Sequence, residues 1–118
     1  MTIKAIDAQK VELNIGKVVE VVAPTTPSDG FQIDFSAQDE RTVFLFHNGG
    51  GSAATVKFVK GDGIQGVADT DALSIPAGKI AAFRLDSGSF KYVTGTNKGK
   101  AVAIPSTADV KCAVIQLP

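Results

Sequence analysis

The sequence is poor in the side chains that most often carry chemistry. It has one cysteine, one histidine and no tryptophan among 118 residues. A single cysteine excludes an intrachain disulfide bond. One histidine and one cysteine also fall short of an ordinary structural zinc site, which takes four such ligands. We therefore expect neither a structural metal centre of this kind nor a cofactor.

The sequence also lacks an excess of charge and any long apolar run. Lysine and arginine total 12, as do aspartate and glutamate, so the formal net charge is zero. Nucleic acids and anionic membranes select basic surfaces, and neither is an expected partner. No apolar run approaches the 18 residues of a transmembrane span. Residues 1–7 do not resemble a signal peptide, so we expect folding in a reducing cytoplasm.

Short apolar runs, broken by turn residues, make up most of the chain. Turn signals recur every 8–12 residues or so, and no helix of ten residues or more is predicted. This pattern predicts an antiparallel β-sandwich of about eight to ten short strands, Greek-key or jelly-roll-like. Beyond the N-terminal segment, the apolar runs that we expect to form these strands lie at residues 31–35, 43–46, 55–59, 73–75, 80–85, 90–93, 101–104 and 109–117.

The stretch 41–60 is the strongest local signal. An apolar run ends at Asn48, three glycines come next, and a second apolar run returns. Asn-Gly between two such runs is typical of a β-hairpin, because both residues tolerate positive φ. The pattern predicts two strands paired side by side.

The N-terminal segment, residues 1–28, is harder to interpret than the sandwich domain at residues 29–118. Val11, Leu13 and Ile15 alternate with polar residues, which favours a strand. Gly16 could then turn the chain into a second run over 18–22, and a short helix near 6–13 is the alternative. The segment is either an extended arm or the first strands of the sandwich.

The last run, residues 109–117, is apolar on both faces, which predicts a strand that is central or covered by a partner. It contains Cys112, which we interpret as a small buried hydrophobe, with Lys111 on the opposite face.

Two glycine-rich stretches resemble nucleotide motifs without their context. Residues 61–66 match G-x-G-x-x-G, and Asp86 lies 20 residues further on. A dinucleotide site needs a helix to begin at the motif. Residues 67–76 are instead acidic and end in a proline, so a glycine turn is the better interpretation. Residues 48–52 lack the Gly-Lys-Ser/Thr ending of a P-loop.

Two further features are candidates for chemistry. His47 could serve as a general base only beside a nucleophile and an orienting carboxylate, and no motif supplies them. Asp62, Asp69 and Asp71 are weak candidates for a calcium site, because carboxylates in a loop are its usual ligands. Solvated loop acids are the simpler interpretation, and we expect no catalytic residues.

Five stretches resemble a known family of phage proteins. They are DERTVFLFHNGG at 39–50, ATVKF at 54–58, SIPAGK at 74–79, LDSGSFK at 85–91 and VIQLP at 114–118. Together they are similar to the capsid decoration, or head auxiliary, proteins encoded among tailed-phage and prophage head genes. The resemblance covers about residues 29–117. Asp86 stands where glutamate is common in the family, and residues 1–28 match it weakly.

The resemblance implies a non-enzymatic structural virion protein. Such a protein is made in the host bacterial cytoplasm, binds the outer surface of the major capsid protein shell and stabilises the head, often as a trimer. The family carries no catalytic motif to transfer. We place capsid attachment first in residues 1–28 and second in the loops 49–52, 61–71 and 95–99.

Two other classes of function stay open at the level of sequence. A ligand-binding β-module, such as a carbohydrate-binding or adhesin-like domain, would expose an aromatic face. An enzyme would place His47 in a cleft with carboxylate or hydroxyl partners.

Overall fold

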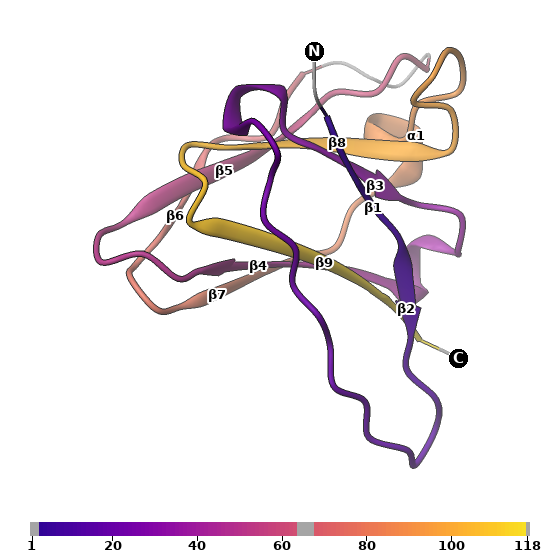
Figure 1. The fold of residues 1–118 in the computed structure, drawn as a ribbon. Helices are drawn as coiled ribbons and strands as arrows, with labels where there is room; N and C mark the ends of the chain where they lie inside the picture. The colour runs from indigo at the N-terminus through magenta and orange to yellow at the C-terminus, as the bar shows by residue number, and fades with distance from the viewer. Residues whose placement is uncertain (1–2, 64–67, 118) are drawn as a thin grey trace.

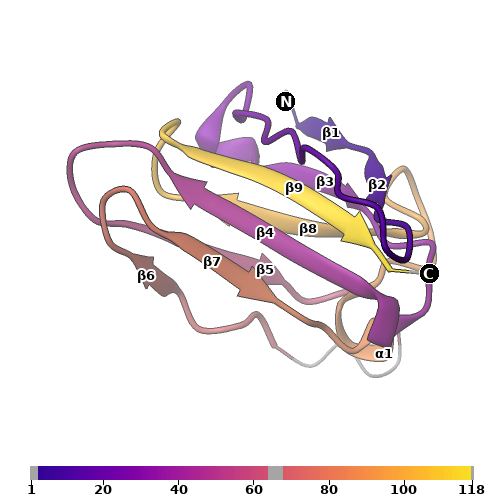
Figure 2. The ribbon, with the colours of Figure 1, turned by 90° about the horizontal axis from the view of Figure 1, so that it is seen from below.

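Two β-sheets pack face to face in the computed structural model, which describes residues 3–63 and 68–117 (Figures 1 and 2). One sheet has the strand order β1-β3-β8-β5-β6 and the other β2-β9-β4-β7. The strands are β1 (Lys4–Ile6), β2 (Ala8–Lys10), β3 (Phe31–Asp34), β4 (Thr42–Asn48), β5 (Ala54–Val59), β6 (Leu73–Ile75), β7 (Ile80–Phe83), β8 (Lys100–Pro105) and β9 (Val110–Gln116). The predicted β-sandwich is confirmed.

Helical structure in the described residues is confined to single turns. These are η1 (Pro27–Asp29), η2 (Asp39–Arg41) and α1 (Ser87–Phe90). Asp86 caps α1 by accepting a hydrogen bond from the backbone N–H of Gly88. Such a cap satisfies a donor that the helix itself leaves unpaired. The apolar run 90–93 consequently begins inside a helical turn and forms no strand.

The core lies between the sheets and results from the alternation of apolar residues. Buried and half-buried positions alternate along β3 and β4, as expected for strands with one face inward. Five phenylalanines are fully buried, and their rings meet mostly edge to face. They are Phe31, Phe35, Phe44, Phe46 and Phe58.

The predicted hairpin over residues 41–60 is wrong, although both of its strands exist. β4 pairs with β7 and β9, whereas β5 pairs with β6 and β8 in the other sheet. Gly49, Gly50 and Gly51 do not adopt the positive φ that a two-residue hairpin turn requires. The Asn48 side chain instead holds the connection, donating to the carbonyls of Ser52 and Ile75 at 2.8 Å each. The chain therefore crosses from one sheet to the other.

β9 lies inside its sheet, with β4 on one side and β2 on the other. Val110, Cys112, Ala113 and Val114 are fully buried. The prediction of a central final strand is confirmed.

The N-terminal segment is divided between the sheets and a protruding loop. β1 pairs in parallel with β3 in one sheet, and β2 pairs in parallel with β9 in the other. Residues 11–21 contain no strand, so the predicted strand over 11–15 is wrong, as is the alternative helix near 6–13. Asn14 interrupts the alternating run with a φ of +63°. Of the second predicted run, 18–22, only Val22 pairs, through a single bridge to Cys112.

Other turns agree more closely with the sequence. The predicted turn at 76–79 closes through a 3.1 Å hydrogen bond from Lys79 N–H to the Pro76 carbonyl, with Gly78 at a φ of +74°. The loop at 95–99 is also present, with positive φ at both terminal glycines. Of the predicted irregular crossing at 64–71, residues 64–67 lie outside the described residues, as does the end of the glycine motif at 61–66.

Candidate functional site: an apolar arm beside a cleft

His47 lies on the outer face of its sheet, and its surroundings do not form a catalytic site. Its neighbours in the adjacent strands are Ile80 and Lys111. It is half-buried, and in the described part of the chain neither a carboxylate nor a hydroxyl contacts it within hydrogen-bond distance. The geometry gives this imidazole no orienting group.

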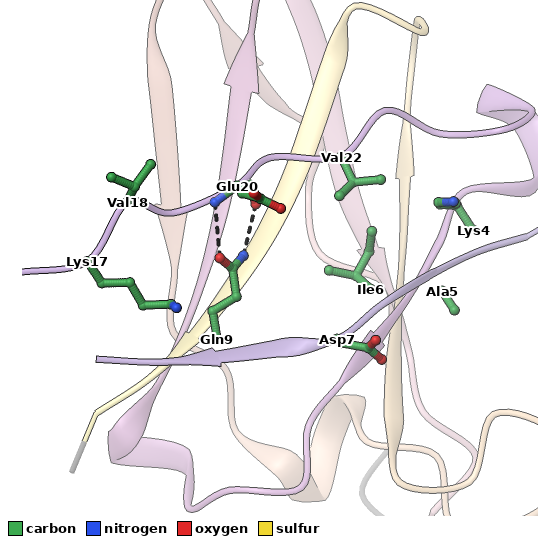
Figure 3. A pocket seen from close by; sticks show the side chains of 9 residues that line it. All are labelled: Lys4, Ala5, Ile6, Asp7, Gln9, Lys17, Val18, Glu20 and Val22. Atoms are coloured by element: carbon green, nitrogen blue, oxygen red, sulfur yellow. Dashed lines mark hydrogen bonds between the residues drawn. The ribbon is translucent and has the colours of Figure 1, made fainter. Parts of the chain in front are cut away.

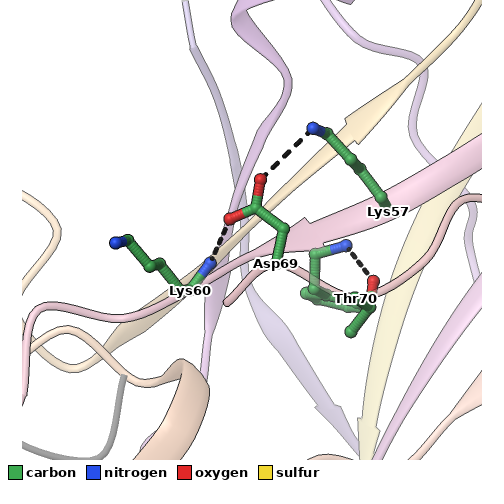
Figure 4. Close-up of polar contacts among 5 residues, drawn as sticks. Lys57, Lys60, Asp69 and Thr70 are labelled. Carbon is green, nitrogen blue, oxygen red and sulfur yellow. Dashed lines mark hydrogen bonds and ion pairs between the residues drawn. The ribbon is translucent and has the colours of Figure 1, made fainter. Parts of the chain in front are cut away.

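The three candidate calcium ligands do not converge. Asp62 accepts hydrogen bonds from the Thr94 hydroxyl and from Val93 N–H, which lower the pKa of its carboxyl. Asp69 accepts from Lys60 N–H at 2.9 Å and from Lys57 Nζ at 3.2 Å (Figure 4), and these contacts lower its pKa. Asp71 is exposed. Within residues 3–63 and 68–117, no three acidic, histidine or cysteine side chains gather to hold a metal.

Asp69 instead fastens a loop to β5. Its neighbour Thr70 accepts a hydrogen bond from Phe58 N–H through Oγ1 at 2.9 Å, and Thr70 N–H donates to the Phe58 carbonyl. Together the two residues occupy the open side of β5 beyond β6. The polar side chains of Asp69 and Thr70 therefore have a structural role, which is to hold this loop against β5.

Cys112 is fully buried in β9, which confirms its interpretation as a small core residue. Burial raises the pKa of its thiol far above the usual range. Because the thiolate is the reactive form, this cysteine is inert in the folded protein.

The aromatic side chains offer no flat exposed platform in the described residues. Five phenylalanines are fully buried, and Phe83, Phe90 and Tyr92 are half-buried. Burial, together with the charges of Asp62 and Asp69, raises the pKa of the Tyr92 hydroxyl. Carbohydrate sites commonly present exposed aromatic rings, so the geometry gives no support to that class.

The most unusual surface is the loop of residues 11–21, which we call the apolar arm. Leu13 is 75% exposed, Ile15 63% and Val18 88%, and Val21 is also exposed. Figure 1 shows the arm extending well beyond the sandwich, beside β2. Several large apolar side chains exposed within one short loop are typical of an interaction surface. Sequence reasoning placed an arm among its alternatives but predicted strands over these residues.

A cleft of about 500 Å³ lies where the arm returns to the sandwich (Figure 3). β1, Asp7 and Gln9 form one side, and residues 17–22 form the other. The Gln9 carboxamide spans the gap at one end, donating to the Glu20 carbonyl at 2.8 Å and accepting from Glu20 N–H at 3.0 Å. The lining residues are Lys4, Ala5, Ile6, Asp7, Gln9, Lys17, Val18, Glu20 and Val22.

The class that the fold defines is a β-sandwich, and the arm and this cleft are the features that distinguish its surface. No protein-family model, curated protein or solved structure matches the chain. In the part of the chain that the structure describes, no helix is long and apolar enough to cross a bilayer.

Proposed function

We propose that the protein is a non-enzymatic structural component of a phage virion. It binds the outer surface of the major capsid protein shell and stabilises the head, after synthesis in the host bacterial cytoplasm. The observation that carries the proposal is the apolar arm, whose exposed side chains need a partner surface. The resemblance of residues 29–117 to capsid decoration proteins supplies the identity of that partner.

The resembling stretches build the scaffold and leave the arm free. DERTVFLFHNGG covers η2 and β4, and SIPAGK covers the end of β6 and the turn before β7. The phenylalanines of β4 lie in the core. The stretches that resemble the family thus account for the sandwich, and the attachment surface falls in the part that differs.

The physical effect is one of linkage. A protein that binds the assembled shell, and not its separated subunits, stabilises the shell by the free energy of binding. Many copies on one shell add their contacts through multivalency, so that modest contacts suffice for each copy. A neutral surface suits this role, because charge repulsion between neighbouring copies is small.

Gene neighbourhood identifies the shell to test. The proposal predicts a major capsid gene beside the gene for this protein, and shells assembled from that product are the probe. Purified protein should co-sediment with the shells and raise their melting temperature. Deletion of residues 12–19 should abolish both effects, whereas removal of 1–28 would also take away β1 and β2.

A pair of point variants gives a matched control. Ile15→Asp alters the arm, and Ile80→Asp alters β7 at nearly equal exposure, 63% against 66%. We expect Ile15→Asp to weaken shell binding strongly and Ile80→Asp to leave it close to wild type, with both variants folded by circular dichroism. Equal binding by Ile15→Asp and wild type would remove the arm from the attachment surface. Failure of the wild type to bind would refute the proposal.

The same proposal includes a homo-oligomer, with a trimer favoured by the resemblance. Light scattering measures the mass in solution directly. A monomer both free and on the shell would count against this part of the proposal alone.

A further inference from the structure

The cleft beside β1 is lined by backbone groups that could pair with an additional strand. β1 is the edge of its sheet, and among residues 3–63 and 68–117 it pairs only with β3. Lys4 N–H donates to the Gly30 carbonyl, so the backbone groups of Lys4 face β3. Successive residues of a strand present these groups to opposite sides, and those of Ala5 therefore face the cleft. An open strand edge is a template for another strand.

On the opposite side of the cleft, a side-chain amide already binds one pair of backbone groups. Glu20 presents its N–H and carbonyl toward β2, and the Gln9 carboxamide bonds to both. A side-chain amide has the same donor and acceptor as a peptide group. Gln9 thus occupies, at one end of the cleft, the position that the peptide group of a paired strand would take.

The side chains around the cleft suit a peptide with little net charge. Ile6 and Val22 lie close together and give it an apolar base (Figure 3). Two lysines, Lys4 and Lys17, are balanced by Asp7 and Glu20. The volume of about 500 Å³ lies within the range of ligand-binding clefts.

We propose that this cleft binds one extended peptide strand of a different protein, by addition to the open edge of β1. The strand would place an apolar side chain against Ile6 and Val22 and carry little net charge. This inference does not depend on the capsid proposal, because it rests on the cleft alone.

A second copy of this chain does not supply the strand from its described residues. Its edge strands β1, β6 and β7 each carry the rest of a sheet on their other side. Residues 17–22 form the far side of the cleft, where that sheet would have to lie. Its apolar arm is bent, with Asn14 at a φ of +63° and Ile15 N–H donating to the Glu12 carbonyl at 3.4 Å. The arm tip is a turn and cannot enter as an extended strand.

The test uses a displayed library of random short peptides, selected on the purified wild-type protein. Enriched peptides should compete with one another and should slow hydrogen exchange in residues 4–7 and 17–22. Ala5→Pro removes the N–H that faces the cleft without removing a hydrogen bond to β3. It should weaken binding by about tenfold or more, the equivalent of one lost hydrogen bond.

Ala82→Pro is the matched control, on the far edge of the other sheet. Asn48 N–H donates to the Lys79 carbonyl, so by the same alternation the N–H of Ala82 faces outward. This variant should bind the peptides like wild type. If Ala5→Pro does not fold, Val18→Trp provides a second variant that fills the cleft from an exposed position, with Val93→Trp as its control.

The inference is overturned if no peptide is enriched, if protection falls outside the cleft, or if Ala5→Pro and Val18→Trp both bind like wild type. Shells take no part in this selection. Peptide binding without shell binding would therefore refute only the capsid proposal. Shell binding without peptide binding would refute only the strand proposal.

Discussion

The rings of Phe44 and Phe58 meet across the two sheets with centroids 5.1 Å apart and planes inclined by 65°. They lie on β4 and β5, the two strands whose sequence predicts a hairpin. In a hairpin the two rings would lie side by side on one sheet. Here they face each other, and the contact joins the two layers of the core.

Phe58 is the ring that most depends on this arrangement, because it contacts Phe44, Phe46 and Phe83. We expect Phe58→Ala to lower the free energy of unfolding by about 3–5 kcal/mol, from lost burial and an unfilled cavity. Phe90→Ala, at a half-buried position on α1, should cost less. Urea unfolding measures both, and an equal loss in the two variants would contradict the assignment of Phe58 to the centre of the core.

Gly30 and Gly78 share a positive φ, +76° and +74°, but differ in their surroundings. A Cβ at Gly30 would lie 2.2 Å from the Ala103 carbonyl oxygen, whereas Gly78 has open space. Gly78→Ala should cost about 1–2 kcal/mol for the left-handed conformation alone. Gly30→Ala should cost distinctly more, because β8 must also move. Thermal denaturation of the two variants measures the difference. Similar melting temperatures would show that β8 shifts at little cost in stability.

Asn48 is fully buried, and three hydrogen bonds satisfy its side chain. Asn48→Asp keeps the oxygen that accepts from Gly50 N–H but loses the donors to the Ser52 and Ile75 carbonyls. Each buried group left unsatisfied costs about 1–3 kcal/mol, and the carboxylate adds a desolvation cost. Both Asn48→Asp and Asn48→Ala should therefore be destabilised in urea, with aspartate the worse. An aspartate variant as stable as wild type would show that the crossing between the sheets does not depend on this side chain.

Cys112 makes stability depend on pH in the alkaline range. Its folded pKa is raised by burial, whereas the unfolded thiol ionises near its ordinary pKa of 9.0. Below that pH both states hold the proton and the stabilisation is complete. Above it only the unfolded state loses the proton, so folding stability falls by up to about 1.4 kcal/mol per pH unit from this group.

The comparison with Cys112→Ala isolates this effect from other groups that titrate at high pH. The difference in unfolding free energy between the two proteins should be constant below a pH of about 9 and should shrink above it. A thiol reagent should also react with native wild type only as fast as the protein opens. Rapid reaction of the native protein, or a difference that does not change with pH, would mean that Cys112 is accessible.

Much of the sandwich could be predicted from the alternation of apolar residues. The runs at 31–35 and 43–46 show which side chains point inward, because a strand has a period of two. That period does not say which sheet a strand joins. β4 and β5 bury one face equally well side by side or face to face, and the choice depends on contacts distant in sequence, such as Asn48 with Ile75.

The candidate site was harder to predict for a related reason. Val11, Leu13 and Ile15 have the pattern of a half-buried strand, but β2 and Val22 already occupy the available edge of β9. The pattern indicates that the segment is amphipathic, but it does not show whether a strand edge is free to pair with it. The cleft likewise forms between Ala5 and Val18, on segments that only the tertiary structure brings together.

The parallel pairing of β2 with β9 has a mechanical consequence. β2 lies near the N-terminal end of the chain, and β9 is the final strand. Pulling on residues 3 and 117 would draw these two strands in opposite directions along their lengths. Their hydrogen bonds would then bear the load together instead of opening one after another. Tension applied at residues 3 and 117 would thus load the β2–β9 pair in shear, the direction in which paired strands resist separation more strongly.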